Sequence, residues 1–452
     1  MNMDRRQFLG SLSLGGLGLM SLPNAWAEDS NTTPVLFPVP TDTGIGGRVV
    51  VVGGGMSGAA VAKYLRLWGG TGVNVTLVEA SPSYTSNIMS NTVLTGQRTL
   101  ASLNYTYATL SGHYGVNRVT AKVSGIDRAQ KLVTLEGGGT IGYDRLVLAP
   151  GLDFDLLPGM TSLAEYETLV PHAWKAGPQT QLLRNQLVAM PAGQNVVLTI
   201  PKAPYRCPPG PYERVCVIAD WLKRNKAGSR IIVLDANADI IVEKENFSHA
   251  FTTLYAGVVD YRPGSTVTQV NSAQRWVTYN QVINGNPVVT NGQIQAAVLN
   301  PIPPQRAPQL LKDAGLLSAD SSKPFAPVDV LTYQSVADPL IHVIGDASLT
   351  TQPKAGHIGN QQGKTCADAV LRLLSGRPMN TQVVTNSACY TPITATTATW
   401  LSAMYQYDPA TRTMVILPQH NNGKAIAAAE ATSDNYQDMQ RWFTTLMGET
   451  FS

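Results

Sequence analysis

The proline-rich segment Pro204–Gly210 contains a cysteine, Cys207, and the carboxyl of Glu213 follows shortly after it. A cysteine thiolate is a nucleophile and a redox group, and a neighbouring carboxyl can accept or donate its proton. A lone cysteine is usually an inert core residue. The rigid proline loop and the nearby acid favour a redox function for Cys207, with Glu213 managing protons; a helix-surface role for Glu213 stays open.

Two apolar runs and a helix must position this loop. The strand Asn195–Ile200 precedes it, the helix Arg214–Asn225 follows, and Ile231–Asp235 is a second strand. This order is typical of a dinucleotide-binding unit, but prolines remove N–H donors and replace the glycines that would cradle a pyrophosphate. The sequence therefore argues against NAD(P)H as electron donor.

A complete dinucleotide fingerprint occurs earlier in the chain. The strand Arg48–Val52 runs into Gly53, Gly55 and Gly58, spaced as G-x-G-x-x-G, and a helix is predicted over Ala59–Leu67. These glycines allow a tight turn, close approach of a pyrophosphate and close helix packing. The next predicted strand, Val73–Val78, ends at Glu79, whose carboxylate suits the ribose hydroxyls and disfavours a 2′-phosphate.

Two further motifs extend the fingerprint. An apolar strand over 145–148 ends in Ala149-Pro150-Gly151, and another over 341–344 ends in Gly345-Asp346. The three motifs together resemble flavoproteins with two dinucleotide-binding domains, in which the last motif places an aspartate on the FAD ribityl chain. The resemblance implies FAD as cofactor, bound by Gly345 and Asp346 as well; a helix N-cap is the alternative role for Asp346.

The N-terminus has the pattern of an export signal. Arg5 and Arg6 precede the apolar stretch 9–22, and Ala25-Trp26-Ala27 is a small-x-small cleavage site. This pattern predicts a twin-arginine signal over 1–27, a linker over 28–46, and a periplasmic location.

Length, composition and charge limit the classes of protein to which the chain can belong. The chain has 452 residues, 44% of them hydrophobic, and a net charge of +3. A length near three ordinary domains and nearly balanced charge indicate a multidomain enzyme and give no sign of nucleic-acid binding. Beyond the N-terminus no apolar run is long enough to span a bilayer, and the four cysteines form neither a zinc-like pair nor a CxxCH haem site.

Several stretches resemble the flavoprotein subunit of flavocytochrome c sulfide dehydrogenase, including the related flavoprotein of sulfur-oxidation gene clusters. They are VVVVGGG, GYDRLVLAPG, PHAWKAGPQT, YRCPPGPYER, NPIPPQRA, IHVIGDAS and QQGK, spread from Gly47 to about residue 390. The implied fold is α/β, with two Rossmann-like dinucleotide-binding domains and a C-terminal α+β interface domain. The expected divisions are 47–152 and 296–375 for the FAD domain, 153–295 for the second Rossmann-like domain without an NAD site, and 376–452 for the interface domain.

The resemblance also implies a mechanism. In that family a redox disulfide lies beside the flavin, and the matching positions are Cys207 and Cys389, the latter in Ser387–Tyr390. Hydrosulfide would attack this disulfide, leaving a persulfide and a thiolate, and two electrons would pass to FAD and then to a separate cytochrome c subunit. Lys354 or Lys364 would stabilise the reduced flavin, although either could be a surface lysine.

One difference from the family concerns flavin attachment. The position of the cysteine that binds the flavin covalently in the best-known members corresponds to Asn87, and the stretch 84–91 has no cysteine. FAD is therefore expected to bind non-covalently. Cys216 and Cys366 fall on predicted helices as core residues, and His357 is expected to be structural.

Three alternatives remain at this stage. A membrane-bound sulfide:quinone reductase is weakened because the predicted helical stretch Asn421–Leu446 lacks a long basic amphipathic face. A flavin-bearing partner that binds or reactivates a sulfur-oxidising complex would react with sulfide slowly or not at all. A type II NADH dehydrogenase would require NADH to reduce the flavin.

Overall fold

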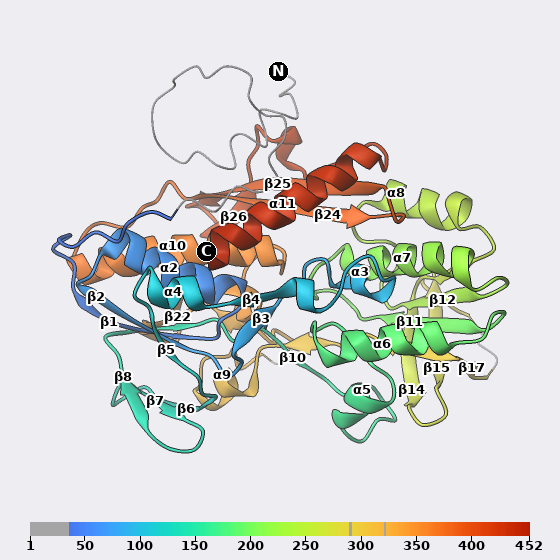
Figure 1. Cartoon of the computed structure of the whole chain (residues 1–452), viewed down its shortest axis with the longest axis horizontal. Coiled ribbons are helices and arrows are strands. Elements are labelled where there is room, and N and C mark those ends of the chain that lie inside the picture. The colour runs from blue at the N-terminus through green and yellow to red at the C-terminus, as the bar shows by residue number, and fades with distance from the viewer. Residues whose placement is uncertain (1–35, 289–291, 321) are drawn as a thin grey trace. The chain divides into compact units, whose positions relative to one another are not determined.

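The structure is a computed structural model that describes residues 36–288, 292–320 and 322–452. The predicted twin-arginine signal and the first part of the predicted linker lie outside the described residues. Residues 36–452 belong to one unit (Figure 1), in which two parallel sheets and one antiparallel sheet position the residues of interest.

The first sheet carries the glycine fingerprint. Its strands follow the order β21-β22-β9-β1-β2-β5, and all neighbours from β22 to β5 are parallel. The strands are β1 (Gly47–Val52), β2 (Val73–Val78), β5 (Asn117–Val119), β9 (Arg145–Leu148), β21 (Gln334–Ser335) and β22 (Asp338–Val343). Helices α2 (Met56–Gly69) and α10 (Gly356–Ser375) pack against each other above this sheet in Figure 1. Because the central strands are covered on both faces, they are almost continuous runs of valine and leucine.

The second sheet carries the cysteine loop. It has the order β13-β12-β11-β18, all parallel, with β11 (Asn195–Ile200), β12 (Arg230–Asp235), β13 (Val259–Arg262) and β18 (Val298–Pro301). Helix α7 (Gly210–Asn225) begins before the predicted start at Arg214. Strand β18 belongs to this sheet, so a domain boundary after residue 295 would separate it from its partner β11. Short apolar strands look alike in sequence, and only their pairing shows which sheet they join.

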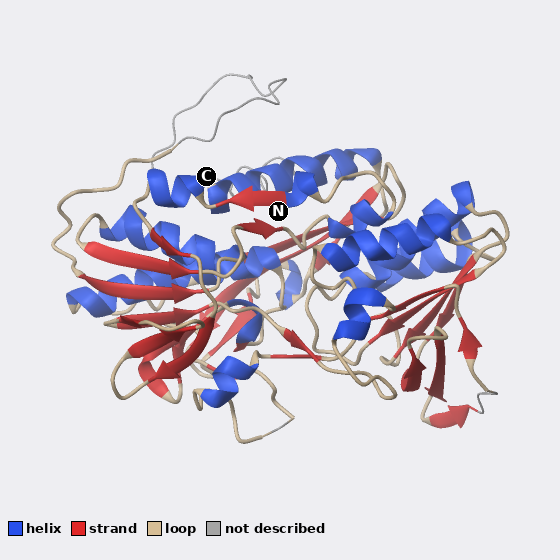
Figure 2. Cartoon of the chain, turned by 60° about the horizontal axis from the view of Figure 1, so that its bottom comes forward, coloured by secondary structure: helices blue, strands red, loops and turns tan. Residues whose placement is uncertain are grey.

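The chain crosses between the two halves more than once. Strand β10 (Asp153–Phe154), on the way into the second half, pairs with β19 (Gln305–Arg306), on the way back. The strands of both halves are visible in Figure 2, and β10 is labelled between them in Figure 1. The α/β fold with two Rossmann-like domains is confirmed.

The C-terminal part is an antiparallel sheet with one long helix. The strands are β24 (Val384–Pro392), β25 (Ala398–Asp408), β26 (Thr413–Ile416) and β27 (Ile426–Ala427), and the helix is α11 (Ser433–Phe451). The helix predicted over Asn421–Leu446 was therefore placed too early. The Thr432 hydroxyl accepts a hydrogen bond from the Asn435 N–H at 3.1 Å and caps α11 at its true start.

Helix α11 packs its apolar face on the FAD-binding half. Phe443, Met447 and Phe451 are buried, and the Phe451 ring stacks on Tyr84 with 5.1 Å between centroids. Within the described ranges, no helix combines the length and hydropathy needed to cross a membrane.

The other elements complete the chain order. They are β3 (Ser83–Thr85), α3 (Ser90–Leu94), β4 (Asn104–Thr106), α4 (Ala108–Gly112), β6 (Val123–Asp127), β7 (Leu132–Leu135), β8 (Thr140–Gly142), α5 (Ala164–Thr168), α6 (Pro178–Ala189), α8 (Lys244–His249), β14 (Ser265–Asn271), β15 (Trp276–Ile283), β16 (Asn286–Val288), β17 (Ile294–Gln295), α9 (Gln309–Asp313), β20 (Ala326–Pro327) and β23 (Ser348–Leu349).

Candidate functional site

The glycine turn after β1 has the geometry of a pyrophosphate cradle. Gly53 has φ +98°, and a Cβ there would lie 2.3 Å from the Ala149 carbonyl oxygen. A Cβ on Gly58 would lie 1.8 Å from the Gly53 carbonyl oxygen, so strand and helix approach too closely for any side chain. A Cβ on Gly55 would meet nothing closer than 3.8 Å, at Tyr84, which leaves the backbone there open to a phosphate.

Glu79 is anchored at the end of β2. One carboxylate oxygen accepts the Gly54 N–H at 2.7 Å, and the other accepts the Ser81 N–H at 2.8 Å. Each carboxylate oxygen has a second lone pair, so this fixed carboxylate can also accept from ribose hydroxyls.

The third motif follows β22 at the same edge of the sheet. The Asp346 carboxylate lies in a short 3-10 turn, 3.5 Å from the guanidinium of Arg206 in the cysteine loop. Another nitrogen of Arg206, Nη2, is buried without a hydrogen-bond partner. An unpaired buried donor beside a carboxylate is an arrangement that a bound polar group would complete.

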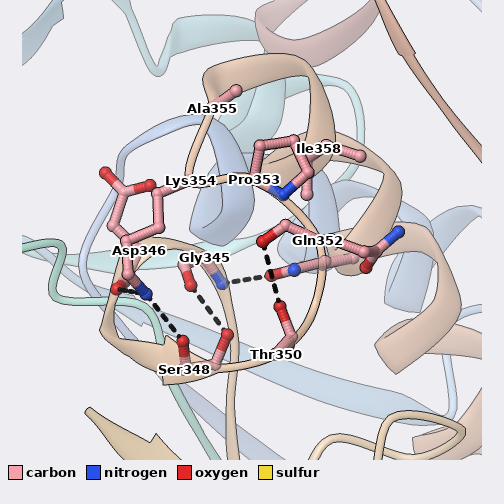
Figure 3. A pocket seen from close by; sticks show the side chains of 11 residues that line it. Gly345, Asp346, Ser348, Thr350, Gln352, Pro353, Lys354, Ala355 and Ile358 are labelled. Atoms are coloured by element: carbon pink, nitrogen blue, oxygen red, sulfur yellow. Dashed lines mark hydrogen bonds between the residues drawn. The ribbon is translucent and has the colours of Figure 1, made fainter. Parts of the chain in front are cut away.

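Lys354 lies beside this third motif, at the same edge of the first sheet. Its ammonium donates to the carbonyl oxygens of Asp346 and Ser348, each at 2.8 Å, in a small pocket that Gly345 and Gln352 also line (Figure 3). Burial lowers the pKa of Lys354 to about 8, and the charge of Asp346 opposes the shift. Lys364, by contrast, forms an ion pair with Glu449 at 3.0 Å.

These residues fit an FAD-type dinucleotide. Gly53, Gly55 and Gly58 would receive the pyrophosphate, and Glu79 the ribose. Gly345, Asp346 and Lys354 would lie along the chain toward the ring.

We expect Gly58→Ala to lose the flavin, because its Cβ cannot fit beside the Gly53 carbonyl and the start of α2 must move. The ratio of flavin absorbance to protein absorbance after purification measures this, with an expected fall of about tenfold or more. Gly112→Ala is the matched control, since a Cβ there would meet nothing within 4 Å. A full flavin content in Gly58→Ala would contradict the cradle.

The cysteine loop connects β11 to α7 and presents Cys207. Cys207 has φ +58°; its N–H donates to the Lys354 carbonyl at 2.7 Å, and its carbonyl accepts the Gly210 N–H at 2.8 Å. A Cβ on Gly210 would lie 2.9 Å from the Cys207 sulfur, so this sulfur sits over the start of α7. The backbone bond to Lys354 ties the thiol to the third flavin motif.

Cys389, on β24, occupies the same buried site. Burial is the main cause of the raised pKa of the Cys207 thiol, followed by the charges of Cys389 and Glu213. Burial also raises the pKa of Cys389 to about 12, with Glu243 and Glu213 adding to the shift. Both half-buried thiols therefore lie near the Glu213 carboxyl, and Cys389 lies near Glu243 as well.

The cysteines are free thiols in the structure, so the Cys207–Cys389 disulfide that the resemblance implies is not formed in it. Thiols with raised pKa values are stable in the protonated, reduced form of such a pair. Cys216 and Cys366 are fully buried on α7 and α10, as predicted for core residues.

Glu213 lies in the first turn of α7 and is buried. The side-chain amide of Asn91 donates to its carboxylate at 2.8 Å. Burial raises the pKa of Glu213 from 4.5 to about 8, while Asn91 and the charge of Arg214 oppose the shift. A carboxyl with this pKa can both hold and release a proton near neutral pH.

A raised carboxyl pKa in the folded state means that stability falls as the pH rises from the unfolded value, 4.5, through about 8. Glu213→Gln removes this dependence and keeps an acceptor for Asn91. We expect its gain in unfolding free energy over the wild type to grow between pH 5 and pH 9, by on the order of a few kcal/mol. Urea unfolding of both proteins at several pH values measures it. Glu430→Gln, at an exposed position, is the control, and parallel curves for Glu213→Gln and wild type would contradict the shift.

Arg214 is the largest fully buried side chain, and the sequence analysis assigned it no role. Its guanidinium donates to the carbonyl oxygens of His172 and Ala173, both at 2.7 Å, and to the side-chain oxygens of Asn91 at 2.8 Å and Asn300 at 3.0 Å. This buried cation fixes the start of α7, from which Glu213 projects.

Asp235 stands where a carboxylate would bind the ribose of NAD, but here it is hydrogen bonded to other side chains of the protein. Asp235, at the end of β12, is fully buried and accepts hydrogen bonds from the hydroxyls of Tyr212 and Tyr261, both at 2.8 Å. Tyr212 belongs to the first turn of α7, where a pyrophosphate would otherwise lie. The carboxylate that a nucleotide ribose would need is therefore already hydrogen bonded within the protein.

His357, on α10, is buried and accepts the Ala388 N–H through Nδ1 at 3.0 Å. Burial lowers the pKa of His357 to about 4, so it is neutral. It fixes the backbone next to Cys389, which agrees with the predicted structural role.

Two protein-family models match the chain. Residues 180–303 match the central part of the sulfide dehydrogenase [flavocytochrome c] flavoprotein chain, and residues 47–197 match pyridine nucleotide-disulphide oxidoreductases. The first match contains the cysteine loop, and the second contains the glycine turn.

Solved structures share the fold at low identity. A sulfide:quinone oxidoreductase from Aquifex aeolicus is 17% identical, with a TM-score of 0.71 over 89% of this chain and 91% of that chain. An NAD-dependent persulfide reductase from A. fulgidus is 16% identical, with a TM-score of 0.57 over 79% of this chain and 64% of that one. In a putidaredoxin reductase–putidaredoxin complex, the matching chain is 18% identical, with a TM-score of 0.59 over 89% of this chain and 93% of that one.

The glycine turn, the cysteine loop and these matches lead to one conclusion: the chain has the pyridine nucleotide-disulphide oxidoreductase fold with a site for an FAD-type flavin, and its residues 180–303 match the central region of the sulfide dehydrogenase [flavocytochrome c] flavoprotein chain.

Proposed function

We propose that the chain is a periplasmic sulfide dehydrogenase that binds FAD non-covalently and passes electrons to a c-type cytochrome. The observation that carries this proposal is the meeting of Cys207 and Cys389 with Glu213 in one buried site, joined through Lys354 to the third flavin motif. The sulfur chemistry is supported by the sulfide dehydrogenase family match over this region.

The two cysteines, Glu213 and Lys354 would each have a separate role in the reaction. In the oxidised state, Cys207 and Cys389 form the disulfide that hydrosulfide attacks. The old sulfur–sulfur bond breaks as the new one forms, which leaves a persulfide on one cysteine and expels the other as a thiolate that a nearby acid can protonate. Glu213 holds a proton close to both sulfurs, and Lys354 places a positive charge at the edge of the flavin site. FAD held by the glycine turn, Glu79 and Asp346 would supply an acceptor for two electrons that can release them one at a time.

The direct test is anaerobic stopped-flow absorbance of the FAD-loaded protein, mixed with sulfide and separately with NADH. We expect fast bleaching of the flavin by sulfide and none by NADH, since Asp235 is hydrogen bonded to Tyr212 and Tyr261. Absent or very slow bleaching by sulfide would overturn the dehydrogenase and favour the non-catalytic partner role. Bleaching by NADH would favour an NADH dehydrogenase.

A quinone is the second candidate acceptor, because the fold matches a sulfide:quinone oxidoreductase over most of both chains. Reoxidation of the sulfide-reduced protein by a c-type cytochrome and by a short-chain ubiquinone separates the two. We expect the cytochrome to react faster, since the apolar face of α11 is packed against the FAD-binding half. Faster reoxidation by the quinone would reverse the assignment.

Export by the twin-arginine pathway is tested by replacing the two arginines of the predicted signal. Replacing both Arg5 and Arg6 by lysine should keep the protein in the cytoplasmic fraction of a host with a twin-arginine pathway. Normal appearance of this variant in the periplasmic fraction would overturn the export route.

A further inference from the structure

Glu243 is a buried carboxyl that the proposed function leaves unused. It precedes α8 with φ +49° and is 5% exposed. One carboxylate oxygen, Oε2, accepts the Thr399 hydroxyl at 3.1 Å, and the other, Oε1, is buried without a hydrogen-bond partner. A half-satisfied buried carboxylate is costly to keep and points to a functional reason.

The register of the C-terminal sheet places this carboxyl near Cys389. Side chains alternate along a strand, so Ser387, Cys389 and Thr391 share one face of β24. Thr391 is the register partner of Thr399, and directly opposed residues share a face. The Glu243 carboxyl, bound to Thr399, therefore lies beside Thr391, about 7 Å along the strand from Cys389.

The Thr391 hydroxyl lies between the carboxyl and the thiol. It is fully buried, its oxygen has no partner that meets hydrogen-bond geometry, and it lies against the same carboxyl as Thr399. A hydroxyl can accept a proton on one side and release its own on the other. The row Glu243, Thr391 and Cys389 is therefore a short path for a proton.

The charges around Glu243 agree with this placement. Burial raises its pKa from 4.5 to about 7, opposed by the hydroxyls of Thr399 and Thr391. The titratable groups facing it are Cys389 on β24 and, on α7, Glu213 and Cys216. Among charged groups, Glu243 raises the pKa of Cys389 most.

We propose that Glu243 donates a proton, through the Thr391 hydroxyl, to the Cys389 sulfur as that sulfur leaves the disulfide. The proposal rests on the proposed function and assigns each sulfur its own carboxyl: Glu213, on the helix that Cys207 precedes, and Glu243 at Cys389. Hydrosulfide forms a bond to the Cys207 sulfur, and the electron pair of the broken disulfide goes to the Cys389 sulfur. That sulfur takes the proton, so the products are a Cys207 persulfide, a Cys389 thiol and a Glu243 carboxylate, with net charge unchanged.

The placement is tested without turnover. The reduced, FAD-loaded protein is alkylated with iodoacetamide across pH 7 to 11, and the Cys389 peptide is followed by mass spectrometry. Glu243→Gln removes a negative charge beside Cys389 and should lower the pKa of this thiol by about one unit. At a pH below that pKa the alkylation rate follows the thiolate fraction, so the rate at Cys389 should rise by about tenfold. Glu245→Gln is the matched control, since it is exposed two residues away. An unchanged alkylation rate in Glu243→Gln would overturn the placement.

The proton transfer is tested by the rate of flavin bleaching by sulfide. Glu243→Gln should slow it by about 10²-fold at pH 6 to 7. Thr391→Val, a variant of similar shape, should slow it similarly while leaving Glu243 in place. Wild-type rates in both variants would overturn the proton path. If the wild type itself does not react with sulfide, the proposed function fails, while the alkylation profile still decides whether Glu243 faces Cys389.

Discussion

Cys207→Ser is expected to abolish flavin reduction by sulfide, with a loss of about 10³-fold or more in rate. Serine cannot form the disulfide that hydrosulfide attacks, and its hydroxyl cannot carry a persulfide. The flavin should remain bound, because Cys207 meets Lys354 through its backbone N–H, which serine retains. Cys389→Ser should behave in the same way.

The measurement is the anaerobic bleaching rate at a fixed sulfide concentration, with the flavin-to-protein ratio recorded for each variant. Cys366→Ala is the matched control, since that thiol is fully buried on α10 and plays no part in the proposed chemistry. Bleaching at the wild-type rate in Cys207→Ser would show that sulfide reduces the flavin without the loop cysteine. Loss of flavin in that variant would instead show a binding role for the loop.

The FAD-binding half of the site could be predicted from the sequence because each of its motifs is a short, continuous segment. Gly53, Gly55 and Gly58 lie within one strand–turn–helix, and the contact that excludes a side chain at Gly58 is with the Gly53 carbonyl of the same turn. Glu79 and Asp346 each end a strand of the same parallel sheet, and parallel strands bring their carboxyl ends to one edge. Periodicity and turn residues therefore carried enough information to predict the fold and this edge.

The sulfur half depended on contacts between residues far apart in sequence. Nothing near Cys207 indicates that Cys389 lies in the same site; only the family resemblance paired them, and the structure brings both beside Glu213. Glu243 was missed because its place is set by β25, through Thr399. The pairing register of β24 and β25 was not predictable from either strand alone.

Arg206 and Arg214 were missed for a different reason. Charged residues in a helix or loop are usually solvated, so neither was singled out. A signal was present for Arg214: it directly precedes the apolar run Val215–Ala219 on the predicted helix. A charge at the edge of such a run indicates a buried network, which the structure shows around this guanidinium.

Arg214→Met is expected to destabilise the second Rossmann-like half by about 3–5 kcal/mol, the usual cost of breaking a buried charged network. Methionine fills a similar length but leaves the carbonyl oxygens of His172 and Ala173 and the oxygens of Asn91 and Asn300 without their donor. Since Ala173 has φ +48°, its loop is held in a conformation that these bonds stabilise.

Thermal unfolding of the FAD-loaded protein measures the loss, and a fall in Tm of about 3–5 °C is expected, since a chain of this length loses about 1 °C per kcal/mol. Arg224→Met on the same helix is the matched control, because Arg224 is half exposed and pairs only with Asp220 one turn away. An equal fall in both variants would mean that helix propensity, not the buried network, sets the stability of α7. Losing the Arg214 charge would raise the pKa of Glu213 further, because this charge lowers it. A fall in Tm that is confined to Arg214→Met and is the same at pH 5, where Glu213 is protonated, would show that this cation fixes the start of α7. The Gly210 N–H, at the start of α7, donates to the Cys207 carbonyl of the cysteine loop. The position of this loop would then depend on Arg214, although Arg214 contacts neither a sulfur nor the flavin site.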